Sequence, residues 1–288
     1  MEIKKIGVLG AGAMGNGIAQ LCAQTGYEVV MRDIADEFVQ RGLKAIDSFL
    51  SKSVEKGKIT DDDKKKTLGR IKGTTKLDDL KDVDIVIEAV LEDLELKKQV
   101  FQEMEKLTRP EVILATNTSS MSITAIGAAV KRSDKVVGLH FFNPVPLMKL
   151  VEIIKGIKTS DETVKVAWAL AEKLGKLPVL VKKDSPGFIV NRLMIIQMME
   201  AIKVYEEGIA SIEDIDKAIK AGLNHPMGPF ELMDLTGIDI AYHVCDYLHR
   251  ELNQELKHVP PVTLKSMVRA GNLGKKSGEG WYKPGDKK

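Results

Sequence analysis

Short runs of β-branched residues alternate with longer amphipathic stretches over residues 4–180, and this alternation constrains the fold more than any other feature of the sequence. Such alternation is typical of a parallel sheet with helices on both faces. We therefore expect an α/β fold with a doubly wound sheet. The seven strands that the runs predict are residues 5–9, 28–31, 84–87, 112–115, 135–139, 148–154 and 178–181.

The connection between the second and third expected strands is long and helical. Apolar residues recur at helical spacing from Val39 to Val54, and Gly57 suits the position just after a helix. Charged residues 60–68 predict a second helix, and we interpret the lysine run at 64–66 as a solvated face.

The pattern changes after Ser185-Pro186-Gly187, where β-branched runs stop and helical periodicity takes over. A chain of 288 residues also favours two domains, because a typical domain has about 150 residues. We therefore expect an α/β domain over residues 1–185 and an all-helical C-terminal domain over residues 186–288.

Several local signals lie in the expected helical domain. Ser211 with Asp214 resembles a capping box, Gly222 is expected to end a helix, and residues 228–256 predict one or two long helices. Three methionines recur among isoleucines at helical spacing, which favours packing in a core or dimer interface over ligand contact. They are Met194, Met198 and Met199.

Composition excludes several classes of protein. The chain has 43 Lys and Arg against 41 Asp and Glu, so no broad basic field indicates nucleic-acid binding. Cys22 and Cys245 lack metal-site spacing, and we expect buried thiols in a reducing compartment and no metal. Met1-Glu2 leads directly into an apolar run, and no run approaches the ~18 residues of a membrane span. We expect no signal peptide, no membrane span and a cytoplasmic location.

A glycine-rich loop, Gly10-Ala11-Gly12-Ala13-Met14-Gly15, follows the first expected strand and opens an apolar-periodic helix. In this context Gly10 makes a tight turn, Gly12 lets the backbone approach a pyrophosphate, and Gly15 permits close packing of helix and strand. The helix N-terminus supplies amide donors for an anion. The loop therefore predicts a dinucleotide site in a Rossmann-like domain.

Asp33 lies eighteen residues beyond Gly15, at the expected end of the second strand. A carboxylate at this position accepts hydrogen bonds from the adenosine ribose and repels a 2′-phosphate. The sequence therefore favours NAD as the cofactor, although the neighbouring Arg32 leaves NADP open.

A base is needed if the bound dinucleotide takes a hydride from an alcohol, because the hydroxyl proton must leave as well. Among the five histidines, only His140 ends an expected strand, at the carboxyl edge where open α/β sheets bind ligands. The others lie in the helical part, and they are His225, His243, His249 and His258. Taken alone, His140 fits a satisfied structural histidine equally well.

The residues after His140 strengthen the catalytic interpretation. Asn143-Pro144-Val145-Pro146 cannot continue a strand, so the chain is expected to turn back through residues 148–154. An antiparallel return centred on residue 146 places Glu152 opposite His140. A carboxylate bonded to one ring nitrogen fixes the tautomer and makes the other nitrogen more basic. The alternative interpretation of Glu152 is an ordinary acid on the protein surface.

Six segments spread over the chain form a recognisable set. They are the Gly10-to-Gly15 loop, Asn117 to Ser120, Gly138 to Val145, Leu150 to Glu152, Pro186 to Arg192 and Gly280 to Tyr282. Together they resemble the L-3-hydroxyacyl-CoA dehydrogenase family over essentially the whole chain, and most of all its short bacterial members, described as 3-hydroxybutyryl-CoA dehydrogenases. The resemblance implies NAD-linked interconversion of L-3-hydroxyacyl-CoA and 3-ketoacyl-CoA, within fatty-acid or butanoate metabolism, by a homodimer formed through the C-terminal domain.

The resemblance also implies catalytic roles. His140 matches the family's base and Glu152 its partner, while Ser119 and Asn191 match residues that contact the substrate. Such donors stabilise the charge that a ketone oxygen gains as hydride arrives. Without the resemblance, Ser119 would be interpreted as the N-cap of a following helix.

Further residues match positions near the cofactor, with ordinary solvated side chains as the alternative. Lys52 and Lys56 lie four residues apart on one helix face, where they suit the phosphates of coenzyme A, although the spacing alone favours an ordinary solvated face. The matching cofactor residues, beside the glycine loop with Met14, are Glu92, Lys97, Ser119, Asn143 and Lys276.

Two other functions remain open on the sequence. One is a two-domain 3-hydroxyacid dehydrogenase that acts on a free acid, usually through a lysine, and shares the Gly-x-Gly-x-Met-Gly loop. The other is an NAD-binding protein without catalysis, since folds are reused for other roles. His140 paired with Glu152 would argue against both.

Overall fold

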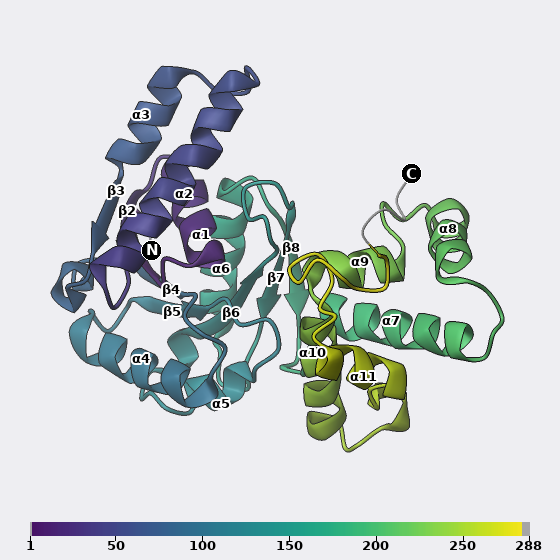
Figure 1. The fold of residues 1–288 in the computed structure, drawn as a ribbon. Helices are drawn as coiled ribbons and strands as arrows, with labels where there is room; N and C mark the ends of the chain where they lie inside the picture. The colour runs from purple at the N-terminus through teal and green to yellow at the C-terminus, as the bar shows by residue number, and fades with distance from the viewer. Residues whose placement is uncertain (1, 284–288) are drawn as a thin grey trace. The chain divides into compact units, whose positions relative to one another are not determined.

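The computed structural model describes residues 2–283, and the chain divides into two compact units, Met1–Ser185 and Pro186–Lys288 (Figure 1). In the described part of the first unit, eight strands form one sheet in the order β3-β2-β1-β4-β5-β6-β7-β8. All neighbouring strands are parallel except β6 and β7, which confirms the doubly wound α/β fold. The strands are β1 Lys5–Leu9, β2 Glu28–Arg32, β3 Ile71–Thr74, β4 Ile85–Glu88, β5 Ile113–Thr116, β6 Val136–Phe141, β7 Leu150–Ile154 and β8 Leu177–Val181.

The expectation of seven strands was wrong by one, because it omitted β3. This four-residue edge strand contains an exposed lysine and a glycine, so it lacks the β-branched run that marks the other strands. Gly73 is required by packing, since a Cβ there would lie 2.6 Å from the Val39 side chain.

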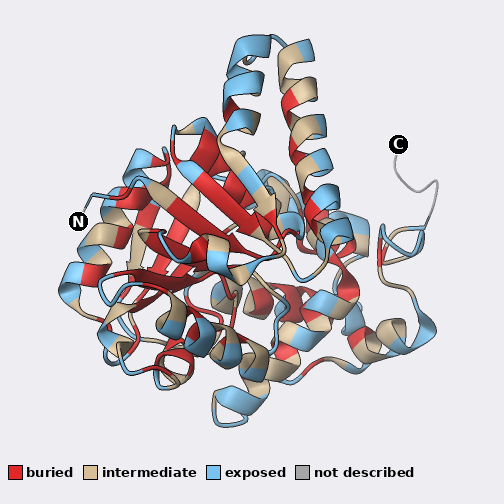
Figure 2. Ribbon diagram, turned by 90° about the vertical axis from the view of Figure 1, so that its left-hand side faces the viewer, coloured by how far each residue is buried: buried red, intermediate tan, exposed pale blue. Residues whose placement is uncertain are grey.

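Helices cover both faces of the sheet, and the strands between them are almost wholly buried (Figure 2). One core joins the sheet to α1, α2 and α6, while α5 packs on the opposite face, where Ile123 meets Gly138. The helices of the first unit are α1 Ala13–Gln24, α2 Asp36–Glu55, α3 Asp61–Gly69, α4 Leu94–Leu107, α5 Ile123–Gly127 and α6 Asp161–Lys173, with single 3-10 turns at Leu77–Leu80 and Ser133–Lys135.

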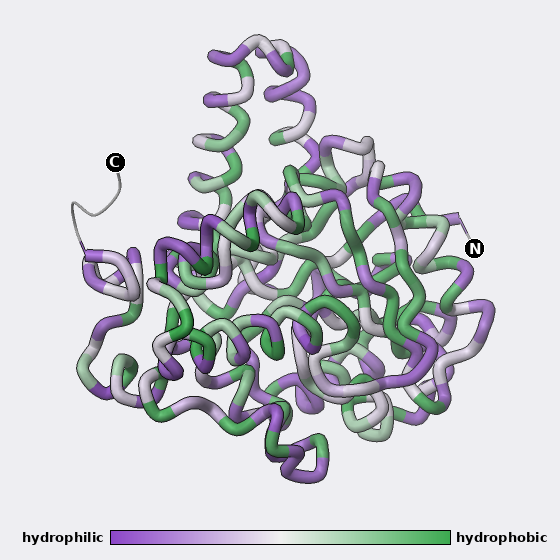
Figure 3. Tube along the Cα trace, turned by 90° about the vertical axis from the view of Figure 1, so that its right-hand side faces the viewer, coloured by the Kyte–Doolittle hydropathy of each residue, from purple (hydrophilic) through white to green (hydrophobic). Residues whose placement is uncertain are grey.

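Helices α2 and α3 form a hairpin that extends beyond the sheet (Figure 1), and hydrophilic residues dominate its outer turns (Figure 3). Gly57 follows the end of α2 and a second helix, α3, comes next, as predicted; Thr60 makes a capping box at its start. The lysine run is not uniformly solvated, however, because Lys64 bonds to Asp47 at 2.8 Å and so ties α3 to α2.

The described part of the second unit is helical around its own core, in agreement with the prediction. Met198 and Met199 are buried in this core beside Phe230 and Trp281, and Met194 packs against it. None of the helices between residues 2 and 283 has both the length and the apolar character needed to cross a bilayer. The helices are α7 Val190–Glu206, α8 Ile212–Leu223, α9 Pro229–Thr236, α10 Ile238–Glu251 and α11 Val262–Ala270, with a 3-10 turn at Leu256–His258.

Helix ends in the second unit follow the sequence signals only in part. Ser211 caps α8 by accepting the Asp214 amide at 3.1 Å, as predicted. Gly222 does not end α8, which continues to Leu223 before the left-handed Asn224 stops it. Residues 228–256 form two helices broken at Gly237 rather than one, and the second ends at Glu251.

Both cysteines are buried and unpaired, as expected. Burial raises the pKa of each thiol to about 12, so neither is ionised near neutral pH.

Candidate active site

The β6–β7 hairpin brings His140 and Glu152 together. The two strands are antiparallel, and their register pairs His140 directly with Glu152, which is the arrangement that the sequence predicts. His140 Nδ1 lies 2.8 Å from Glu152 Oε2, and the exposed fractions of the two residues are 5% and 1%. A buried carboxylate at this distance orients the imidazole.

Two residues that sequence reasoning left without a role hold this hairpin. Asn117, which follows β5, accepts the Phe141 amide at 2.9 Å and so fixes the end of β6. Lys176, just before β8, donates to the carbonyls of Val145 and Met148 at 2.6 and 2.7 Å. Burial lowers the pKa of this lysine. No local pattern marks Lys176, because its partners lie about thirty residues earlier in the chain.

Ser119 lies in the loop after β5, beside Glu92 from the loop after β4. Glu92 Oε1 accepts the Ser119 amide at 3.0 Å and the Thr118 hydroxyl at 2.5 Å. Burial opposes ionisation of Glu92, but the nearby Lys97 charge and the donated hydrogen bonds outweigh it and lower the pKa of the carboxyl. The N-cap of α5 is Ser122 rather than Ser119, so the capping interpretation of Ser119 was wrong.

Lys97 is not the solvated side chain that the alternative interpretation expected. It is 1% exposed and lies between two carboxylates, 2.8 Å from Glu88 and 3.1 Å from Glu92. Glu92 is partly exposed, since 41% of its side chain is accessible. Sequence reasoning missed Glu88, which is the last residue of β4 and fully buried.

The glycine loop has the geometry that a dinucleotide pyrophosphate requires. A Cβ on Gly10 would lie 2.4 Å from the Ala89 carbonyl oxygen, and one on Gly15 would lie 1.9 Å from the Gly10 oxygen. Above Gly12, in contrast, no atom lies within 4 Å of that position. Helix α1 starts at Ala13 with no side-chain cap and no acid in its first turn. Its exposed N-terminus therefore fits an anionic ligand.

Asp33 and Met14 support this loop. Asp33 follows β2, and its carboxylate accepts the amides of Ala11 and Ile34, both at 2.7 Å. The neighbouring Arg32 donates through Nε to the Thr75 carbonyl at 3.3 Å. Met14 is half-buried and packs against the core beneath the loop.

The remaining predicted residues are dispersed over both units. Asn143 is exposed in the turn of the β6–β7 hairpin, and Lys52 and Lys56 are exposed where α2 ends, remote from its Asp33 end. Asn191 is the second residue of α7, and Lys276 forms an ion pair with Asp239, both within the second unit.

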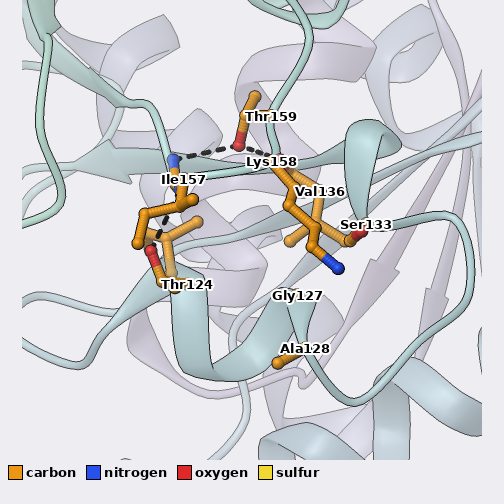
Figure 4. A pocket seen from close by; sticks show the side chains of 10 residues that line it. Thr124, Gly127, Ala128, Ser133, Val136, Ile157, Lys158 and Thr159 are labelled. Carbon is orange, nitrogen blue, oxygen red and sulfur yellow. Dashed lines mark hydrogen bonds between the residues drawn. The ribbon is translucent and has the colours of Figure 1, made fainter.

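A pocket of about 230 Å³ in the first unit lies at the other end of β6 (Figure 4). Val136, the first residue of β6, lines it together with Thr124, Ile157 and Thr159, and its surface is largely apolar. It contains none of the predicted site residues.

Comparison with known proteins identifies one family. The profile of the 3-hydroxyacyl-CoA dehydrogenase NAD-binding domain matches residues 5–185, and that of the C-terminal domain matches residues 187–284. The chain is 48% identical to a probable 3-hydroxybutyryl-CoA dehydrogenase of Deinococcus radiodurans, over 97% of this chain and 99% of the relative. It is 43% identical to the human mitochondrial hydroxyacyl-coenzyme A dehydrogenase, over 98% of this chain and 91% of the relative.

Solved structures include the same group of enzymes. The crystal structure of (S)-3-hydroxybutyryl-CoA dehydrogenase from Ralstonia eutropha superposes with a TM-score of 0.94 at 47% identity, covering 98% of this chain and 99% of that one. Both family profiles, the full-length relatives and the shared fold lead to one conclusion. The chain belongs to the 3-hydroxyacyl-CoA dehydrogenase family of nicotinamide-dependent oxidoreductases.

Proposed function

We propose that this enzyme interconverts L-3-hydroxyacyl-CoA and 3-ketoacyl-CoA with NAD(H), and that 3-hydroxybutyryl-CoA and acetoacetyl-CoA are its substrates. The observation that carries the proposal is the buried contact between His140 Nδ1 and Glu152 Oε2 at the carboxyl end of β6. Relatives named 3-hydroxybutyryl-CoA dehydrogenase, 44% to 48% identical over nearly the whole chain, support the substrate class.

In the oxidation direction, His140 Nε2 takes the proton of the 3-hydroxyl group while C3 loses hydride and the C–O bond becomes a carbonyl. The bound nicotinamide supplies the hydride acceptor. Glu152 stabilises the imidazolium that forms, because its carboxylate already holds Nδ1. In reduction the steps reverse, and the Ser119 hydroxyl and the Asn191 amide stabilise charge on the ketone oxygen.

The geometry around Asp33 supports NAD over NADP. Its carboxylate stands beside the glycine loop, where it would accept hydrogen bonds from a ribose and repel a 2′-phosphate. Arg32 Nε donates to the Thr75 carbonyl. Glu92, Lys97, Asn143 and Lys276 complete the proposed cofactor contacts, and Lys52 and Lys56 the proposed coenzyme A contacts.

We also propose an oligomeric state, a cellular location and a metabolic role for the enzyme. Exposed apolar side chains on the second unit support a homodimer through that unit. We place the enzyme in the cytoplasm, in fatty-acid or butanoate metabolism. The exposed apolar side chains of the second unit include Leu193, Ile209, Leu223, Leu235, Ile240 and Val262.

Substitution of His140 by Gln tests the proposal, with His243→Gln on the exposed face of α10 as the matched control. His140→Gln should bind NADH nearly as well as the wild type, while turnover of acetoacetyl-CoA falls by about a thousandfold or more, because the acid and base is lost. The control should retain turnover. Wild-type turnover in His140→Gln would refute the assignment, and turnover of acetoacetate in place of acetoacetyl-CoA would favour a free-acid dehydrogenase.

A further inference from the structure

Glu88 is a fully buried carboxylate at the carboxyl end of β4. Its Oε1 accepts the Lys97 ammonium at 2.8 Å and the Val90 amide at 2.7 Å. Its Oε2 accepts the Thr116 hydroxyl, from the end of β5, at 2.7 Å. Because both carboxylate oxygens are engaged by the protein and the exposed fraction of Glu88 is 0%, this side chain cannot touch a ligand directly.

These contacts close into a ring across the ends of β4 and β5. Lys97 also contacts Glu92 at 3.1 Å, Glu92 accepts the Thr118 hydroxyl, and the Thr118 amide donates to the Thr116 hydroxyl at 3.1 Å. We call this set the charged ring, and its members are Glu88, Glu92, Lys97, Thr116 and Thr118. It contains two carboxylates and one ammonium, so it carries one surplus negative charge.

The charged ring lies where the nicotinamide half of the cofactor is expected. The glycine loop follows β1, and the sheet order puts Asp33 on its β2 side and His140 on its β6 side. A dinucleotide crosses the carboxyl ends of the strands with its pyrophosphate at that loop. If Asp33 holds the adenosine ribose, the other half lies over β4 to β6, beside the ring. This step rests on the proposed function.

We propose that the surplus charge of the ring favours the oxidised, cationic nicotinamide over the neutral, reduced one, and that Glu88 sets this preference as a positioning residue. A charge acts strongly at such a site because water is excluded beneath it. Tighter binding of NAD+ relative to NADH tilts the bound equilibrium toward hydride delivery to the 3-ketoacyl thioester. The His140–Glu152 pair is the same in the wild type and in variants of the charged ring. Its effect on NAD+ and NADH binding therefore cancels when those proteins are compared.

Glu88→Gln tests this inference, because Gln has the same shape and keeps an oxygen for Lys97 and Val90 while the ring becomes neutral. The ratio of the dissociation constants of NAD+ and NADH should rise by about threefold to tenfold. The double variant Glu88→Gln/Lys97→Met removes the whole Glu88–Lys97 ion pair. The Glu92 carboxylate then remains, so the ring again has one negative charge, as in the wild type. We expect its ratio to return to the wild-type value even if both forms bind more weakly.

The measurement is NADH fluorescence titration with displacement by NAD+, on the full chain and below the melting temperature of each variant. Asp84→Asn is the matched control, because it removes a hydrogen-bonded carboxylate at the opposite end of the same strand. Its ratio should equal that of the wild type. If Glu88→Gln does not fold, Glu92→Gln neutralises the ring from its partly exposed side and should raise the ratio likewise.

Two results would overturn the inference: a ratio in the neutral-ring variant within about twofold of wild type, or an equal rise in the double variant. Failure of the proposed function is a separate outcome, since the wild type itself would then bind neither NADH nor NAD+.

Discussion

At the residue scale, the ends of neighbouring strands carry the side chains on which the proposed chemistry depends. Asp33 follows β2, Glu88 ends β4, Thr116 ends β5, and His140 lies one residue before the end of β6. Each side chain is held by hydrogen bonds to an adjacent strand or loop. Conservative substitutions here should therefore alter ligand binding or catalysis more than they alter the sheet.

Asp33→Asn should weaken NADH binding by about threefold to tenfold, because a charged acceptor for ribose hydroxyls becomes a neutral one. NADPH binding should stay the same or improve, since the repulsion of its 2′-phosphate is removed. The measurement is fluorescence titration with both cofactors. Asp36→Asn, at the exposed start of α2, is the control and should change neither affinity. Equal losses for NADH and NADPH in Asp33→Asn would contradict the ribose role.

The sequence was informative about some of these residues and silent about others. The His140–Glu152 contact was predictable because the register of a short antiparallel hairpin follows from where the chain turns. The burial of Lys97 was not, because its partner Glu88 lies on a strand nine residues earlier and no helical or strand period joins them. Lys176 was likewise invisible, since its partners are backbone carbonyls.

At the element scale, a strand is predictable where it contains a run of apolar, mostly β-branched residues. Of the two edge strands, β8 has such a run and β3 does not. The seven predicted strands are present with ends shifted by at most two residues, while β3 pairs only with β2 and contains a lysine and a glycine. Helix ends depend on single residues that adopt a left-handed conformation. In α8 the sequence offers Gly222 and Asn224, and the chain adopts the left-handed conformation at Asn224.

Asp84 ties the start of β4 to the start of β1, and its contribution should depend on pH. Burial opposes its ionisation, yet hydrogen bonds from the Lys4 and Lys5 amides and from Arg109 lower the pKa of this carboxyl. A lowered folded-state pKa adds stability that is complete above the ordinary aspartate pKa near 4 and is lost as the pH falls through the folded value. Asp84→Asn should therefore cost about 1 to 2 kcal/mol at pH 7 and progressively less in acid.

Urea unfolding at a fixed protein concentration, from neutral pH into acid, measures this difference. The exposed neighbour Asp82→Asn is the control and should follow the wild type throughout. A destabilisation of Asp84→Asn that stays constant across the pH range would show that the carboxylate charge contributes nothing.

At the scale of the whole molecule, each unit has its own hydrophobic core, one built on the sheet and one on helices. The change from strand periodicity to helical periodicity was visible in the sequence because the two cores require different spacing of apolar residues. The order of the strands was not, since parallel neighbours such as β1 and β4 are brought together by crossovers of many residues.

The proposed homodimer predicts a solution mass of about twice the chain mass of 31.7 kDa. Light scattering coupled to gel filtration measures it directly. Leu223→Asp and Val262→Asp place charges on exposed apolar positions of the second unit, and at least one should shift the mass toward that of the monomer. A wild-type mass near 31.7 kDa would refute the dimer.

The β6–β7 hairpin has one more consequence, for how new members of this family arise. His140 and Glu152 are twelve residues apart within a single continuous segment, so nothing beyond Ser185 is needed to bring them into contact. A chimera that keeps residues 1–185 and takes its helical part from a relative should therefore keep the His140–Glu152 contact on which the proposed proton transfer depends. Any altered preference for acyl-chain length in such a hybrid would then be traceable to the borrowed part.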